Sequence, residues 1–387
     1  MQVKKAILIF LLWFAGLGAA AQFAKIAVPF GAIQALYPDQ DAELGWLLSL
    51  ISLVGAVLGI VGGTLVSALG PKRVLLVGLL LGGAISLGQA SLPGFGLMLF
   101  SRIPEGLSHL AIVVAAPTLI ADLASERYRG AAMALWGTFF GVAFVLVAAL
   151  SAPLLALGGL TYLFSAHGIS MLVIAVLLAL GLGQEGHTEN PENRLDMAFV
   201  LDQHRRSYGS AFVAAPGIGW LFYTLTYVSI LTLLPQMVGE EESAFLAGSM
   251  STISIVTSMI LVPLLLVFMS GIGVVVLGFA TSLGVVLWAL SGPDIALVGI
   301  ALFAMLGLVQ GATFVAVPEL TQTLQHRALS YGVMAQTGNI GNLLGTPILL
   351  AIIGAGGQAA MFASAAAVYA LAIIAHGLLH RRRRRQA

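Results

Sequence analysis

Long apolar runs separated by short polar breaks fill nearly the whole chain. The apolar residues are continuous instead of alternating, which argues against a transmembrane β-barrel. A helix of about 20 apolar residues crosses a bilayer core of about 30 Å, so each run predicts one membrane helix. We expect these helices at residues 6–36, 44–69, 74–92, 95–122, 130–153, 161–183, 211–238, 244–269, 272–291, 294–320, 329–353 and 357–379.

One long polar stretch, residues 184–210, divides the chain almost evenly. We expect a cytoplasmic linker there, with a short amphipathic helix on the membrane surface over residues 195–206. The predicted domains are a six-helix bundle over residues 1–183 and a second six-helix bundle, with a basic cytoplasmic tail, over residues 211–387.

The two halves repeat at a single offset, which pairs Gly106 with Gly307 and Pro117 with Pro318 without a gap. Because each half has six predicted helices, both halves begin on the same side of the membrane and the repeat is parallel. Parallel repeats that rock about a midplane site are a recurring transporter plan. The predicted fold is therefore an all-α membrane protein of 12 transmembrane helices, in two bundles related by a pseudo-twofold axis along the membrane normal. We expect it to be a monomer.

Composition agrees with a membrane protein. The chain is 59% hydrophobic and 9% charged, with a mean hydropathy of +1.02, whereas soluble domains are about 25% charged. The first apolar run extends to Leu36, far beyond the core of a cleaved signal peptide. The absence of cysteine removes disulfides and thiol chemistry. No clustered metal ligands or cofactor motif stand out, and the net charge of +1 gives no reason to expect a nucleic-acid partner.

The basic residues predict the orientation in the membrane, because lysine and arginine are enriched in cytoplasmic loops. Of the 17 lysines and arginines, all except Lys25 and Arg102 fall in every second break or at the termini. The intervening breaks carry acids instead. Both termini are therefore expected in the cytoplasm, in a bacterial-type inner membrane, with the Arg381–Arg385 run against anionic lipid. The basic positions are Lys4, Lys5, Lys72, Arg73, Arg127, Arg129, Arg194, Arg205, Arg206, Arg327 and Arg381–Arg385.

Two local motifs resemble those of the major facilitator superfamily. The break after the second predicted helix runs from Gly63 through Gly70 to Lys72 and Arg73, similar to the G-x-x-x-D-R-x-G-R-R signature, although Ser67 replaces its aspartate. The fourth helix reads Arg102-Ile-Pro-Glu105-Gly106, similar to R-x-x-Q-G with glutamate in place of glutamine. The resemblance implies a secondary transporter that works by alternating access. The expected cytoplasmic gate comprises Gly63, Gly70, Lys72, Arg73, Asp122, Arg129 and Glu319.

The fourth predicted helix carries Arg102, Glu105 and His109 on one face. Counting about 1.5 Å per residue from the helix ends places both Glu105 and Lys25 near the midplane, so Lys25 is expected to meet Glu105 or Arg102. A structural ion pair between two helices is one interpretation. However, the three groups carry one excess positive charge, which an anionic substrate group would balance; loss of the Lys25 proton would also remove it. We read His109 as a weaker substrate-site candidate and His167 as structural.

The second half supplies neutral polar side chains at membrane depth, suited to a polar ligand although such groups also hold membrane helices together. Together with Gln22, which is one turn from Lys25, the candidates for substrate binding are Tyr223, Thr226, Tyr227, Gln310, Gln336, Asn339 and Asn342.

These patterns favour a transporter of a small polar, anionic or zwitterionic, organic solute, with Glu105 as a hypothetical proton-coupling carboxylate. An exporter of amphipathic compounds and a lipid flippase are alternative functions. A membrane enzyme is not favoured, because no nucleophile–base pair or metal cluster stands out, and a channel is not favoured, because nothing resembles a selectivity filter.

Overall fold

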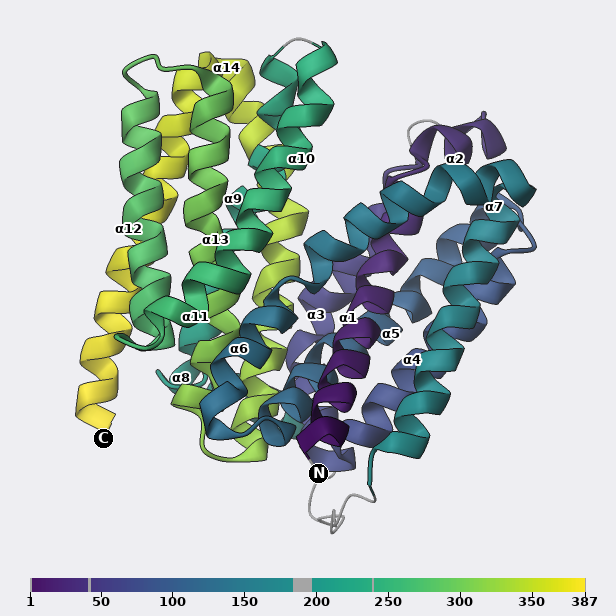
Figure 1. The fold of residues 1–387 in the computed structure, drawn as a ribbon, viewed down its shortest axis with the longest axis horizontal. Coiled ribbons are helices and arrows are strands. Elements are labelled where there is room, and N and C mark those ends of the chain that lie inside the picture. The colour runs from purple at the N-terminus through teal and green to yellow at the C-terminus, as the bar shows by residue number, and fades with distance from the viewer. Residues whose placement is uncertain (1, 41–42, 184–196, 239, 387) are drawn as a thin grey trace. The chain divides into compact units, whose positions relative to one another are not determined.

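The computed structural model describes residues 2–40, 43–183, 197–238 and 240–386, and all regular elements in these ranges are helical (Figure 1). Residues 184–196, most of the predicted linker, lie outside the described residues. The elements are α1 Gln2–Ala27, α2 Phe30–Leu36, α3 Trp46–Leu69, α4 Pro71–Gln89, α5 Phe95–Leu123, α6 Glu126–Gly137, α7 Phe139–Gly181, α8 Met197–Gly209, α9 Ala214–Leu233, η1 Pro235–Met237, α10 Glu240–Val256, η2 Thr257–Leu261, α11 Val262–Leu265, α12 Gly271–Ala289, α13 Ile295–Leu320 and α14 Leu324–Gln386.

Ten stretches of the described helices are long and apolar enough to cross a membrane. Two of them contain a pair of spans each, because α7 is kinked at Gly158–Gly159 and α14 at Gly357. Gly159 and Gly357 both adopt a φ of 65°, in the left-handed region that favours glycine. Counting both members of each pair gives the twelve spans that the apolar pattern predicts.

Two of the predicted spans are each divided by a turn into two α-helices. The first, expected over residues 6–36, breaks between α1 and α2 at Pro29, which has no backbone N–H to continue the helix. The fifth, expected over residues 130–153, is divided at Thr138 into α6 and the first arm of α7. At this break the Thr138 backbone N–H and hydroxyl both donate to the Leu135 carbonyl, at 3.1 and 2.7 Å. A continuous apolar run therefore does not show where the backbone hydrogen bonding of a membrane helix is interrupted.

The described chain forms two compact units. The first comprises Met1–Ser125 and Phe139–Gln203, and the second comprises Glu126–Thr138 and His204–Ala387. In the first unit α5 packs against α1, α3 and α4, and α7 packs against α1 and α4. In the second unit α9 packs against α14, and α13 packs against α6, α10 and α12. The helix α6 therefore belongs by its contacts to the second unit, although the arm of α7 that follows it belongs to the first.

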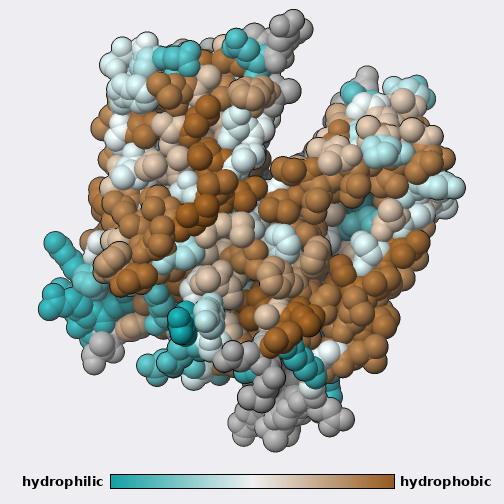
Figure 2. Space-filling model, viewed as in Figure 1, coloured by the Kyte–Doolittle hydropathy of each residue, from teal (hydrophilic) through white to brown (hydrophobic). Residues whose placement is uncertain are grey.

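The outer surfaces of both units are apolar. On the face drawn in Figure 2, brown residues cover the middle of the helices in each unit and teal residues gather near the helix ends. Large apolar side chains such as Phe100, Leu180 and Phe268 are 65, 79 and 86% exposed. Surfaces of this kind are stable against lipid tails, where helices satisfy their own backbone hydrogen bonds.

Close packing of α9 against α14 depends on glycine. A Cβ at Gly345 would collide with the Leu225 carbonyl oxygen and lie 2.5 Å from Ser229 Oγ, whereas a Cβ at Gly354 would meet nothing within 4 Å. We expect Gly345→Ala to lower the free energy of unfolding by about 1–3 kcal/mol through overpacking. Gly354→Ala, the same change in the same helix, is expected to leave it equal or higher. Thermal unfolding of both variants in one detergent measures the difference; equal melting temperatures would contradict this account of the helix contact.

Candidate functional site

The helix α5 presents its ionisable residues to the interior of the first unit. Arg102 and Glu105 are 0% exposed, and His109 is 6% exposed. They lie on the helix face that packs against α1, α3 and α4. A charged side chain at the centre of a membrane helix costs roughly 2.5–3.5 kcal/mol on insertion scales. Each of these groups therefore requires partners within the bundle.

One carboxylate is shared between two cations. Lys25 Nζ, from α1, lies 2.6 Å from Glu105 Oε1, and Arg102 Nη1 donates to Glu105 Oε2. Lys25 is 1% exposed, so the whole group is removed from solvent. The structure thus brings together the three residues whose encounter the sequence predicts. With all three ionised, this triad (Lys25, Arg102 and Glu105) has one excess positive charge.

The Arg102 guanidinium also joins three helices. Its Nε donates to the Leu47 carbonyl in α3 at 2.7 Å, and its Nη2 donates to the Gln22 carbonyl in α1 at 2.8 Å. The fork geometry of arginine directs these bonds and the one to Glu105 in different directions. Arg102 is therefore fixed in position as well as charged.

The helix α4 contributes two polar residues that the sequence analysis did not single out. Lys25 Nζ donates to Ser86 Oγ at 2.9 Å and to Gln89 Oε1 at 2.6 Å, while Gln89 Nε2 donates to Glu105 Oε2 and to Ser101 Oγ, each at 2.8 Å. Ser86 and Gln89 are three residues apart on a buried face of a helix that is otherwise apolar after Lys72 and Arg73 in its first turn. That spacing was the available signal, because such residues point the same way.

His167, which we read from the sequence as structural, lies beside Lys25. Its Nε2 is 2.9 Å from the Gly18 carbonyl oxygen, and its Nδ1 is 2.9 Å from Ser86 Oγ and 3.5 Å from Lys25 Nζ. A carbonyl oxygen only accepts, so Nε2 bears a proton and Nδ1 is the position that faces the triad. His167 thus extends the polar network from α1 and α4 to the second arm of α7.

The remaining first-unit candidates flank the triad. His109 Nδ1 lies 3.0 Å from the Ala19 carbonyl oxygen, and its ring meets Phe23 edge to face at 5.0 Å. Gln22 Nε2 donates to Ser108 Oγ at 2.8 Å. Among the described residues Gln22 Oε1, although buried, has no hydrogen-bond partner. Gln22 therefore retains an unused acceptor next to the Arg102 site.

In the second unit, three of the candidates come together. Tyr223 donates to Gln310 Oε1 at 3.2 Å, Ser254 donates to the same oxygen at 2.7 Å, and Gln310 Nε2 donates to the Gly137 carbonyl at 2.8 Å. Tyr227 lies 4.8 Å from Tyr223 between ring centroids. Ser254 was not predicted, because α10 contains four serines and the sequence does not indicate which of them faces Gln310.

The other second-unit candidates are dispersed. Thr226 and Asn339 bond to backbone carbonyls of their own helices, at 3.1 and 2.7 Å. Gln336 accepts from the Tyr208 hydroxyl of α8 at 2.8 Å, and burial raises the pKa of Tyr208, which keeps that hydroxyl a donor. Asn342 Oδ1 has no partner among the described residues.

The predicted gate residues lie near helix ends. Lys72 Nζ donates to the Leu182 and Gly183 carbonyls at 2.8 and 3.0 Å, joining the start of α4 to the end of α7. Glu319 accepts from the Gly271 backbone N–H at 2.7 Å, at the start of α12. Gly70 ends α3 with a φ of 88°. The remaining members are placed as follows: Gly63 is buried in α3, Arg73 is in the first turn of α4, Asp122 is near the end of α5, and Arg129 is in α6.

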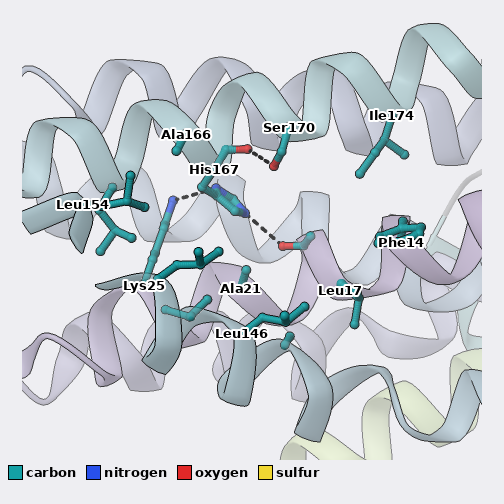
Figure 3. Close-up of a pocket in the computed structure, with 15 residues that line it drawn as sticks. Phe14, Leu17, Ala21, Lys25, Leu146, Leu154, Ala166, His167, Ser170 and Ile174 are labelled. Atoms are coloured by element: carbon teal, nitrogen blue, oxygen red, sulfur yellow. Dashed lines mark hydrogen bonds between the residues drawn. The ribbon is translucent and has the colours of Figure 1, made fainter. Parts of the chain in front are cut away.

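The first unit also contains a cavity of about 230 Å³ between α1 and the two arms of α7. Figure 3 shows the Lys25 side chain directed toward His167 at one side of it, with apolar residues including Leu17, Leu146 and Leu154 around the rest. The cavity therefore reaches the triad from within this unit.

A model of the Major Facilitator Superfamily matches residues 6–345, nearly the whole chain. The chain belongs to this superfamily. It is accordingly an integral, multi-pass membrane transporter and not an enzyme. Members of this superfamily bind small-molecule substrates. The twelve spans described above are the number that the superfamily fold implies.

Solved structures of transporters share the fold. The E. coli fucose:proton symporter FucP is 14% identical with a TM-score of 0.77, covering 97% of this chain and 99% of its own. The proton:xylose symporter XylE, bound to 6-bromo-6-deoxy-D-glucose, is 15% identical with a TM-score of 0.74, covering 96% and 95%. The human organic anion transporter MFSD10 is 15% identical with a TM-score of 0.71, covering 96% and 99%. Comparison with curated protein sequences finds no match.

Proposed function

We propose that this protein carries a small polar organic solute with an anionic group, either an anion or a zwitterion, across the membrane by alternating access. The observation that carries the proposal is the buried triad. Lys25 and Arg102 share the single carboxylate of Glu105, and all three side chains are at most 1% exposed. An uncompensated charge in a low-dielectric interior is costly. A substrate carboxylate or phosphate would compensate the excess charge when it binds.

Groups in both units are suited to the rest of such a solute. Gln22 offers an unused acceptor in the first unit, and Asn342 offers one in the second. Tyr223, Tyr227 and Gln310 provide an aromatic and amide surface in the second unit. We propose that Gln22, in the unit that contains the triad, binds the uncharged polar part of the substrate. The side chains of the second unit are further substrate-binding candidates, and we propose that the protein works as a monomer.

Proton coupling through Glu105 is the second part of the proposal. FucP and XylE are described as proton symporters of sugars, and MFSD10 as an organic anion transporter. In this chain Glu105 is the acid in contact with both buried cations. Protonation of this carboxylate would free Lys25 and Arg102 to bind a substrate anion, which links proton binding to substrate binding.

A stability screen of the purified transporter tests the substrate class. The probes are matched small molecules: carboxylic acids, amino acids, their primary amides, amines, and the sugars fucose and xylose. Ligands bound to the folded state raise the melting temperature. We expect carboxylates or amino acids to stabilise the protein and their amides to have a much smaller effect. Stabilisation by sugars alone, or by amines alone, would contradict the proposal.

In the proposed orientation, both termini lie on the cytoplasmic side of a bacterial-type inner membrane. Because the sequence contains no cysteine, single cysteines report their side without background. Cysteines at Gly94 and Glu241 are expected to react with an impermeant maleimide from the periplasm. One at Asn193, which lies outside the described residues, is expected to react only after permeabilisation. The reverse labelling pattern would overturn the orientation.

A further inference from the structure

The cavity of the first unit has one polar side and otherwise apolar walls. Lys25 and His167 lie on the polar side, and most of the remaining lining comes from aliphatic side chains of α1 and α7 (Figure 3). Its volume of about 230 Å³ is below the roughly 300–1,000 Å³ typical of pockets for drug-sized ligands. The lining extends along α1 from Phe14 to Lys25, about 16 Å at about 1.5 Å per residue, so the space is long for its volume and suits a single slender chain better than a bulky polar molecule.

Exposed apolar residues belong to the same lining. Phe14, Leu146 and Leu150 line the cavity and are 44, 41 and 52% exposed. In a membrane protein, surfaces of this composition are stable against lipid tails. These positions connect the interior of the cavity with the exposed apolar surface of the unit, so an apolar molecule can enter the cavity from that surface.

The ammonium group of Lys25 can donate to a new acceptor with little loss of hydrogen bonding. It has three protons, and four acceptor atoms lie within 3.5 Å: Ser86 Oγ, Gln89 Oε1, Glu105 Oε1 and His167 Nδ1. The Ser86 hydroxyl has other partners, since it donates to the Phe164 carbonyl at 2.9 Å and lies 2.9 Å from His167 Nδ1. A carboxylate that replaces Ser86 on Lys25 therefore leaves the Ser86 hydroxyl bonded to the Phe164 carbonyl.

Charge complementarity identifies the head group. The triad carries one excess positive charge when its members are ionised, and Lys25 is the member that lines the cavity. A monoanion balances that charge, whereas a neutral or cationic head group does not.

We propose that the cavity between α1 and α7 binds a single-chain anionic amphiphile from the bilayer, specifically a long-chain fatty-acid anion. Its carboxylate lies on Lys25 beside His167, and its alkyl chain lies along the apolar walls of α1 and α7. This site overlaps the one proposed for the transported solute at Lys25, where one anion balances the excess charge, but its apolar walls are not part of the solute site. Binding of the amphiphile is measured directly and does not depend on transport.

The test is equilibrium binding of tritiated palmitate to the purified protein in nanodiscs. We expect saturable binding that unlabelled palmitate displaces, while the neutral alcohol hexadecanol and the short acid butyrate compete at least about tenfold less well, because each lacks either the charge or the apolar contact. Ala166→Leu adds bulk to the cavity lining, and is expected to weaken palmitate binding about tenfold. Ala179→Leu, the same change at an exposed position of the same helix that does not line the cavity, is expected to bind as the wild type does.

A photoreactive palmitate with a diazirine near its methyl end provides a second measurement on the wild-type protein, independent of any variant's folding. Labelled peptides from α1 and α7 support the site. Labelling confined to other helices, equal competition by hexadecanol or butyrate, or equal binding by folded Ala166→Leu and Ala179→Leu would overturn it. Ala166→Leu is expected to transport the polar solute normally, so loss of palmitate binding with transport intact separates this proposal from the proposed function.

Discussion

Transport is expected to be lost when Arg102 is replaced by alanine. The guanidinium binds Glu105 and two backbone carbonyls of neighbouring helices, and it is completely buried. Its removal also leaves Lys25 and Glu105 as a neutral pair, so the excess charge that we propose for substrate binding disappears. Breaking a buried charged interaction costs about 3–5 kcal/mol. If substrate binding loses this free energy, the affinity for the substrate falls at least about a hundredfold, and the uptake rate falls with it. Initial uptake rates in proteoliposomes measure the effect.

Arg102→Lys is the matched control for charge. It keeps the positive charge but loses the planar fork that bonds Glu105, Gln22 and Leu47 in three directions. We expect partial activity from Arg102→Lys and none from Arg102→Ala, with both variants folded by size-exclusion chromatography. Unimpaired transport by folded Arg102→Ala would remove this residue from the mechanism.

Replacement of Glu105 by glutamine is expected to separate transport from the proton gradient. Each oxygen of the Glu105 carboxylate faces a different cation, and Gln89 donates a hydrogen bond to the oxygen that Arg102 also binds. Glutamine keeps the shape but cannot gain or lose a proton near neutral pH. In proteoliposomes, accumulation driven by a pH gradient should disappear, while counterflow exchange of substrate continues.

Counterflow is the internal control of that experiment, because it shows that the variant still binds and alternates. Undiminished pH-driven accumulation by Glu105→Gln would contradict the coupling role and leave Glu105 as a structural partner of Lys25 and Arg102. Loss of both activities in a variant that no longer elutes as a folded monomer would instead show that the carboxylate is needed to hold the bundle together, which also contradicts the coupling role.

The apolar pattern and the helical period were sufficient to predict much of the first unit. The contact between Lys25 and Glu105 could be predicted because each is a charged residue in an apolar helix, and such residues need a partner. Counting residues from the helix ends places both at the same depth in the membrane. The break at Pro29 could also be predicted, because proline has no backbone N–H to continue the helix. The division at Thr138 was not, because the apolar run continues through it and the bonds of Thr138 to Leu135 depend on local backbone geometry.

The partners of a polar side chain were harder to predict than its presence. Ser86, Gln89 and His167 join Lys25 because α4 and α7 are rotated to face α1 at that depth, and a single sequence contains no direct measure of that rotation. Gln336 and Asn339 share a spacing in the sequence, yet Gln336 contacts α8 while Asn339 bonds within its own helix. Spacing along one helix establishes a common face, but the neighbouring helix decides what that face contacts.

The most direct test of the central claim compares the charge preference of the wild type with that of Lys25→Met. This substitution removes the excess positive charge and leaves Arg102 and Glu105 as a neutral pair. The probes are the carboxylate that best stabilises the purified protein and its primary amide, and the measurement is the initial rate of transport of each in proteoliposomes without a pH gradient. The wild type is expected to prefer the carboxylate by at least about tenfold, and Lys25→Met is expected to lose this preference. An equal rate for both probes in the wild type, or an unchanged preference in folded Lys25→Met, would contradict it.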